Sequence, residues 1–169
     1  MKTMKPLEAK ILYDRIRRKN RGLYVWLIPD ENSTLDILDL IETAPFKVFN
    51  ATELHCTVLH CKQSELPPRI NEPKDVVYKS QLTGFQTWQD HKNRTIVVAC
   101  LDGLADLHKL LTRQGLIHSY ADFNPHITIA KDIKLDAEAR LWLLKANRFV
   151  YRRSQSVVFR SQIMASPAG

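Results

Sequence analysis

The pattern of apolar and polar residues along the chain predicts a protein that mixes strands with helices. Apolar or alternating runs typical of strands occupy residues 22–28, 54–60, 76–85, 94–101, 125–131 and 156–165. Apolar residues recur at helical spacing over residues 6–18, 33–43, 104–114 and 136–147. Asn32-Ser33 and Asp136 are typical helix N-caps, and Gly115 suits the residue after a helix. Residues 62–75 hold three prolines and are predicted to form a loop.

The order of these elements repeats once. A strand, a helix and a strand over residues 24–60 are followed by the same three elements over residues 95–131. Tyr24 lies 31 positions before His55, and Thr95 lies 31 positions before His126. Glycine is scarce, and no low-complexity linker separates the copies. We therefore expect one domain, residues 1–169, built from two similar lobes.

The second strand of each copy carries a histidine and a threonine two residues apart. His55 and Thr57 share one face of their strand, and His126 and Thr128 share one face of theirs, because side chains alternate along a strand. The residues between and after them are apolar, so the opposite face suits packing under helices. An imidazole and a hydroxyl are a poor choice for a core face and a sensible choice for the floor of a cleft.

Two histidines that face each other across a cleft suit the cleavage of a phosphodiester. One imidazole can take a proton from the attacking hydroxyl and the other can give a proton to the departing oxygen, because the ordinary imidazole pKa of about 6.5 permits either role near neutral pH. The hydroxyls of Thr57 and Thr128 can donate to the phosphate oxygens where negative charge develops. This scheme needs no metal or other cofactor.

Paired His-x-Thr motifs on strands about 70 residues apart resemble those of the 2H phosphoesterase superfamily; here they lie 71 apart. The resemblance implies an α+β, two-lobed fold in which two antiparallel sheets line a central cleft and helices pack outside. It also implies a hydrolase with His55, Thr57, His126 and Thr128 as catalytic residues. Superfamily members act without metal on 2′,3′-cyclic phosphates, 2′–5′ linkages or oligonucleotide 3′ ends.

Within the superfamily, the first strand (residues 22–25) and the strand around His55 most resemble those of the phage anti-CBASS nucleases. That resemblance implies cleavage of the 3′,5′ bonds of cyclic di- and trinucleotide immune messengers, with a ribose 2′-hydroxyl as the nucleophile. It makes Tyr24 a candidate for stacking on a base or orienting the substrate. It leaves the C-terminal substrate contacts open, where residues 156–164 offer Arg160.

Other aromatic and basic residues divide into core and binding candidates. Trp26 and Trp142 lie in apolar periodic segments and are expected in the core, whereas Trp88 and Tyr120 are expected in loops, where they can bind a base. Residues 15–21 carry five positive charges, which suit either a solvated helix end or the attraction of phosphate. Arg148, Arg152, Arg153 and Arg160 offer the same two interpretations.

The remaining histidines and cysteines do not predict a metal site. On a regular strand His55 and Cys61 face one side while Cys56 and His60 face the other, so tetrahedral zinc binding would require a break in the strand. We expect His60 at a strand end, and His91, His108 and His118 exposed. Three cysteines cannot form a disulfide framework, which indicates a reducing compartment.

Composition limits the class of protein. Apolar residues make up 44% of the chain and charged residues 25%, which is typical of a globular protein. The longest apolar runs are far short of the about 20 residues of a membrane span, and no apolar stretch follows the basic N-terminus as in a secretory signal. We expect a cytoplasmic protein, in the bacterial host cytosol if a phage encodes it, with no membrane partner and as a monomer. The net charge of +7 favours an anionic substrate.

Three functions remain open from the sequence. The first is a phosphodiesterase for cyclic oligonucleotides. The second keeps the same site but acts on short RNA-like substrates, namely ends with 2′,3′-cyclic phosphates or 2′–5′ bonds. The third is a sponge that binds cyclic nucleotides without cleaving them, against which the two intact His-x-Thr motifs argue. The sequence does not assign the acid and the base to particular histidines, nor the bases that are preferred.

Overall fold

The computed structural model describes residues 23–62, 76–160 and 164–166. The predicted helix at residues 6–18, the basic segment 15–21 and most of the loop at 62–75 lie outside the described residues. The described residues form three helices and seven strands. The helices are α2 (Glu31–Ile41), α3 (Ala105–Thr112) and α4 (Ala137–Arg153); the strands are β1 (Leu23–Leu27), β2 (Cys56–Cys61), β3 (Val77–Gln89), β4 (Thr95–Asp102), β5 (His126–Ala130), β6 (Ser156–Arg160) and β7 (Met164–Ser166).

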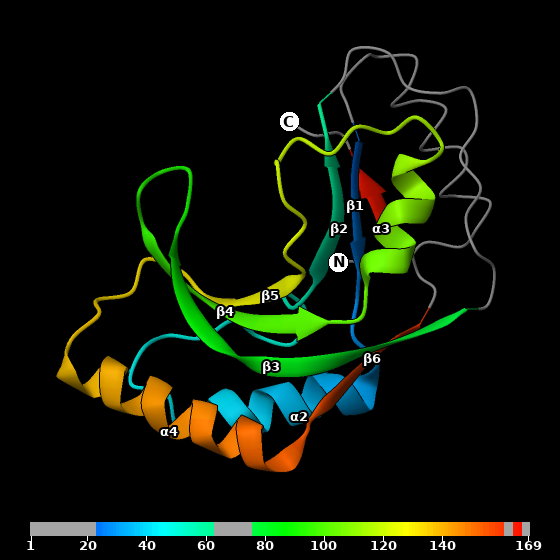
Figure 1. Cartoon of the computed structure of the whole chain (residues 1–169). Helices are drawn as coiled ribbons and strands as arrows, with labels where there is room; N and C mark the ends of the chain where they lie inside the picture. The colour runs from blue at the N-terminus through cyan, green and yellow to red at the C-terminus, as the bar shows by residue number, and fades with distance from the viewer. Residues whose placement is uncertain (1–22, 63–75, 161–163, 167–169) are drawn as a thin grey trace.

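The strands form one antiparallel sheet in the order β6-β3-β4-β5-β2-β1-β7. The sheet is strongly curled: α2 and α4 lie under the half that contains β3, and α3 lies beside β1 and β2 (Figure 1). All three helices cover the outer side of the curl, and no described helix lies on its inner side (Figure 1). The predicted α+β architecture with helices outside is confirmed.

The two antiparallel sheets expected from the sequence are two halves of this single sheet. One half contains β4 and β5 and the other contains β1 and β2, and they join where Cys56 of β2 pairs with Ile127 of β5. Both joining residues are fully buried. The second strand of each predicted copy therefore lies at the centre of the sheet, next to the second strand of the other copy.

The two outer strands of the sheet come close together. Arg160 ends β6 and Met164 begins β7, so four peptide steps, at most about 15 Å, connect the two edges. Pro29, just after β1, forms an isolated bridge with Phe159 of β6, and the N–H of Asp30 donates to the carbonyl of Val158 at 2.8 Å. The single strand predicted over residues 156–165 is therefore two strands that serve opposite edges of a nearly closed sheet.

Local signals explain the helix ends. Asp30, one residue before α2, accepts a hydrogen bond from the N–H of Ser33 at 2.8 Å, so it is the N-cap that the sequence placed at Asn32-Ser33. Ser33 is instead buried, and its hydroxyl accepts from the N–H of Val158 at 2.8 Å. Asp136 caps α4 as predicted, and that helix continues past residue 147 to Arg153.

Helix α4 is fixed to β3 by a side-chain amide. Asn147 accepts from the N–H of Phe85 at 2.6 Å and donates to its carbonyl at 3.1 Å, where β3 has a bulge. A Cβ at the neighbouring Gly84 would lie 2.8 Å from the Asn147 amide oxygen, and Gly84 has a φ of +155°. Only glycine permits both this backbone conformation and this close approach of the helix.

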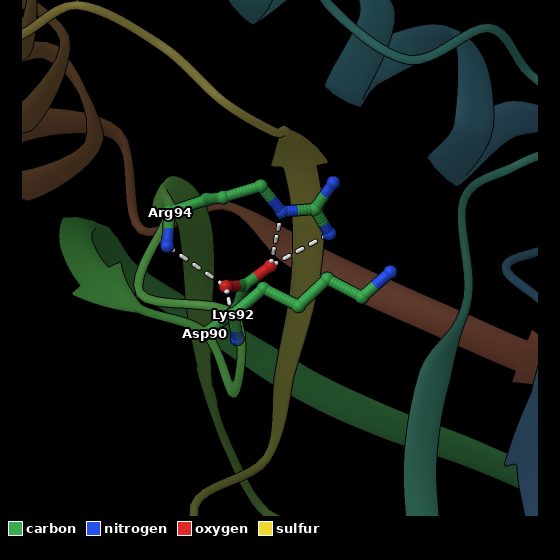
Figure 2. A network of polar contacts seen from close by, with 3 residues as sticks. All are labelled: Asp90, Lys92 and Arg94. Atoms are coloured by element: carbon green, nitrogen blue, oxygen red, sulfur yellow. Dashed lines mark hydrogen bonds and ion pairs between the residues drawn. The ribbon is translucent and has the colours of Figure 1, made fainter.

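The turn between β3 and β4 is closed by one carboxylate. Figure 2 shows Asp90 accepting from the backbone N–H groups of Lys92 and Arg94, each at 2.9 Å, and from the Arg94 guanidinium. Asn93 takes the left-handed conformation that the turn requires, with a φ of 57°. These hydrogen bonds from Arg94 and Lys92, with the Arg94 charge, lower the pKa of Asp90 to about 2.

We predict that Asp90→Asn lowers the melting temperature at neutral pH, because it removes the charge that these donors stabilise. The folded-state pKa lies below the ordinary value of 3.8, so the carboxylate stabilises the fold above that value and loses its contribution as the pH falls toward 2. Thermal unfolding of wild type and variant should therefore converge in that range. Asp39→Asn, at an exposed position of α2, is the matched control; a pH-independent difference at Asp90 would contradict the prediction.

Candidate functional site

The two His-x-Thr motifs lie side by side at the centre of the sheet. Cys56 pairs with Ile127, so one antiparallel step on either side places Thr57 opposite His126 and His55 opposite Thr128. The two histidines are then diagonal neighbours across this one pair, close enough for the charge of His55 to affect the titration of His126. All four side chains are half-buried and share one face of the sheet, while Cys56 and Ile127 are buried on the other. The sequence-derived assignment of faces is confirmed.

Both imidazoles are held by the same backbone contact. Nδ1 of His55 lies 2.9 Å from the carbonyl oxygen of Glu53, and Nδ1 of His126 lies 2.7 Å from that of Asn124. A carbonyl only accepts, so each Nδ1 carries the hydrogen. In the neutral ring Nε2 then holds the free lone pair, and in the charged ring Nε2–H is the free donor. Each ring is therefore oriented to exchange a proton through Nε2.

Tyr24 connects the first strand to the site. Its hydroxyl lies 2.6 Å from Oγ1 of Thr57 and 3.4 Å from Nε2 of His55. Burial is the main cause that raises the pKa of Tyr24, so the phenol stays protonated at neutral pH. When Tyr24 donates to Thr57, the threonine hydroxyl keeps its own hydrogen for another acceptor.

A bulge follows the threonine in each of these strands. In β2 the register shifts between Thr57 and Leu59, and in β5 it shifts between Thr128 and Ala130. The extra residue returns His60 to the face that carries Thr57, where its ring lies 5.6 Å from that of Tyr24. His60 lies next to the last residue of β2, near the strand end where it was expected, but its expected direction away from His55 is wrong, because a regular alternation does not contain the bulge.

Three further aromatic rings lie at the site. Trp88 contacts His126 with ring centroids 4.5 Å apart, and it belongs to β3 rather than to the predicted loop. Tyr120 is 63% exposed in a loop, as predicted, and its ring lies 5.5 Å from that of His60. Trp26 is buried as expected, yet its ring lies 6.2 Å from that of His55, because it pairs with Thr57 across β1 and β2.

The remaining candidates lie elsewhere. The backbone of Arg160 ends β6, which β3 and β4 separate from β5 in the sheet order, so its contribution stays a prediction. His108 and His118 are half-buried rather than exposed. His108 stacks on Phe123 at 4.0 Å, and Nδ1 of His118 accepts from the N–H of His60 at 3.2 Å. The first contact joins α3 to the loop before β5 and the second joins that loop to β2, and the sequence contains no local signal for them.

The electrostatics of the site keep both central histidines neutral. Burial is the largest cause that lowers the pKa of His55, and the Lys131 charge lowers it further. Burial also lowers the pKa of His126, with the charge of His55 as an additional cause. Each imidazole is therefore uncharged at pH 7 and ready to accept a proton at Nε2.

The described residues offer neither a metal-binding cluster nor a membrane-spanning helix. Within them, no group of three or more His, Cys, Asp or Glu side chains is arranged to hold a metal ion. The described helices include none with the length and apolar character to cross a membrane.

We predict that His55→Asn raises the pKa of His126 relative to wild type, because the variant removes a nearby positive charge that opposes protonation of His126. Titration of the ring protons by NMR measures this shift. His91→Asn, which changes an exposed histidine, should leave the pKa of His126 unchanged. An unchanged His126 pKa in His55→Asn would show that the two rings do not interact.

Comparison with known proteins gives the family. A model of the family described as anti-CBASS protein Acb1 matches residues 21–147. The anti-CBASS protein Acb1 of Vibrio phage KVP40 is 28% identical over 116 residues, covering 68% of this chain and 75% of that protein. The crystal structure of E. coli LigT complexed with NADP+ aligns with a TM-score of 0.45 and 16% identity, covering 87% of this chain and 94% of that chain. Because the matched segment spans well over half of the chain and both His-x-Thr strands, the protein belongs to the anti-CBASS protein Acb1 family.

Proposed function

We propose that this protein is a metal-independent phosphodiesterase that cleaves 3′,5′ bonds in the cyclic di- and trinucleotide messengers of bacterial antiviral defence. The observation that carries the proposal is the placement of His55 and His126 as diagonal neighbours on one face, each with its hydrogen held on Nδ1, so that Nε2 is the nitrogen that can exchange a proton. Membership of the anti-CBASS family supports cyclic oligonucleotides as the substrate class.

In the proposed reaction the ribose 2′-hydroxyl attacks the adjacent phosphorus. One imidazole takes the hydroxyl proton at Nε2 while the bond from the 2′-oxygen to phosphorus forms. The other imidazole, protonated at Nε2, gives its proton to the 5′-oxygen as the bond from that oxygen to phosphorus breaks. The products are a 2′,3′-cyclic phosphate and a free 5′-hydroxyl. The proton count balances without a cofactor.

In this proposal the threonines donate hydrogen bonds to the phosphate, and Tyr24 orients one of them. Thr57 and Thr128 stand opposite the two histidines, so their hydroxyls can donate to the non-bridging oxygens as negative charge develops there. Tyr24, 2.6 Å from Thr57, fixes the direction of the Thr57 hydroxyl and is a positioning residue. Trp88 beside His126 and Tyr120 beside His60 are the candidate platforms for the two bases next to the cleaved bond.

We predict that His55→Ala and His126→Ala each reduce cleavage of a cyclic dinucleotide by about 10²- to 10⁴-fold, because each removes one proton-transfer group. Products are separated by chromatography after incubation in EDTA. His91→Ala is the matched control, since His91 is exposed and outside the site. Cleavage only of RNA with 2′,3′-cyclic ends would replace this function with RNA end processing. Intact nucleotide that elutes with wild-type protein would indicate a sponge.

We predict a bell-shaped pH dependence of kcat/KM with its maximum below the ordinary imidazole pKa of 6.5. The reaction needs one neutral and one protonated imidazole, and the pKa values of both His55 and His126 are lowered in the free protein. The maximum lies between the two values, and the pair titrates as a unit. A profile that rises steadily above pH 7 would contradict the assignment of both histidines.

A further inference from the structure

The 71-residue spacing of the two copies extends beyond the His-x-Thr motifs to a second pair of contacts. Lys131 lies 71 positions after His60, and Tyr120 lies 71 positions after Phe49. In one half the rings of His60 and Tyr120 are 5.5 Å apart, and in the other half Nζ of Lys131 lies 5.5 Å from the centre of the Phe49 ring. Each half therefore has a nitrogen-bearing side chain past its His-x-Thr motif, next to an aromatic ring from a loop.

In both halves that loop belongs to the opposite copy. The N–H of Phe49, in the loop before β2, donates to the carbonyl of Ile129 in β5 at 2.7 Å. The N–H of Ser119, in the loop before β5, donates to the carbonyl of His60 in β2 at 2.6 Å. The two loops thus pair with the edges of β5 and β2 where these strands no longer pair with each other, beyond Cys56 and Ile127. They also bring the rings of Phe49 and Tyr120 beside the site.

The bulges place the side chains of His60 and Lys131 on the face of the site. The bulge in β2 returns His60 to this face, and its contact with the Tyr24 ring shows the result. The bulge in β5 acts on Lys131 in the same way, because it inserts one residue between Thr128 and Ala130. The charge of Lys131 is accordingly close enough to His55 to affect its titration.

The side chains of His60 and Lys131 differ in charge. Burial and the Lys62 charge lower the pKa of His60, so that ring is neutral at pH 7. Lys131 is exposed, and a lysine ammonium is ordinarily charged at that pH. Within the described residues the one ion pair joins Arg94 and Asp90, so no described carboxylate neutralises Lys131. Among the described residues, the ammonium on the His55 side of the site therefore forms no ion pair, and the Phe49 ring faces it.

We propose that Lys131, with its ammonium held over Phe49, binds the phosphate of a cyclic oligonucleotide that is not being cleaved; this rests on the proposed function. The cleaved phosphate lies between the two histidines, beside Thr57 and Thr128. Lys131 is the first residue after β5 and stands three residues past Thr128, at most about 10 Å along the chain, which suits the next phosphate of the ring. A cyclic oligonucleotide has such a second phosphate, and a nucleoside monophosphate does not.

Binding to the His126→Ala variant, which keeps the substrate intact, tests the assignment. Lys131→Met in this background should weaken the binding of cyclic di-AMP about tenfold and leave adenosine 5′-monophosphate within twofold, because only the first ligand has a second phosphate. Lys131→Arg should retain the affinity for cyclic di-AMP within about threefold. Lys134→Met, at an exposed position nearby, is the matched control.

The outcomes separate this inference from the proposed function. Unchanged cyclic di-AMP affinity in Lys131→Met, or an equal loss for both ligands, overturns the role of Lys131, while cleavage by wild type would still support the phosphodiesterase. Wild-type protein that neither binds nor cleaves cyclic di-AMP overturns both. In free protein, Lys131→Met should also raise the His55 pKa in an NMR titration, and an unchanged value would overturn the placement of the ammonium.

Discussion

The pairing of Cys56 with Ile127 is the contact on which the site depends. Each half of the sheet can place an imidazole and a hydroxyl on its own strand, yet neither half alone can bring two imidazoles to one phosphate. The antiparallel register at this pair sets which side chains face each other. A shift by one residue would move one His-x-Thr motif to the helix-covered face, and burial of Cys56 and Ile127 opposes such a shift, since the shift would expose one of the two.

The backbone carbonyls of Glu53 and Asn124 add a second constraint. They are the residues two positions before each histidine, so the same local geometry occurs in both copies. By fixing the hydrogen on Nδ1 they leave Nε2 as the proton-exchanging atom of both rings. The environment then distinguishes the rings: Tyr24 and the Lys131 charge lie near His55, and Trp88 lies against His126. Two copies of one motif thus acquire different surroundings, as the proposed roles of acid and base require.

Much of this could be predicted from the sequence because it follows from local periodicity. The alternation of side chains put His55 with Thr57 and His126 with Thr128, and the repeated order of elements put both motifs on equivalent strands. Long-range and irregular features could not be predicted. The bulge that returns His60 to the face of the site has no distinct residue signal. Trp88 is predicted in a loop because the predicted strand ends at residue 85, whereas β3 continues to Gln89. The division of residues 156–165 between two edges depends on the curl of the whole sheet.

The division of residues 156–165 between two borders of the sheet affects folding during synthesis. Strands β6 and β7 complete opposite borders of the sheet, yet a ribosome synthesises them together, after every other described strand. Until they emerge, both borders offer unpaired backbone groups to any neighbouring chain. Folding of the sheet as a whole is therefore coupled to the end of this segment's synthesis, and the nascent polypeptide is most open to mispairing just before that moment.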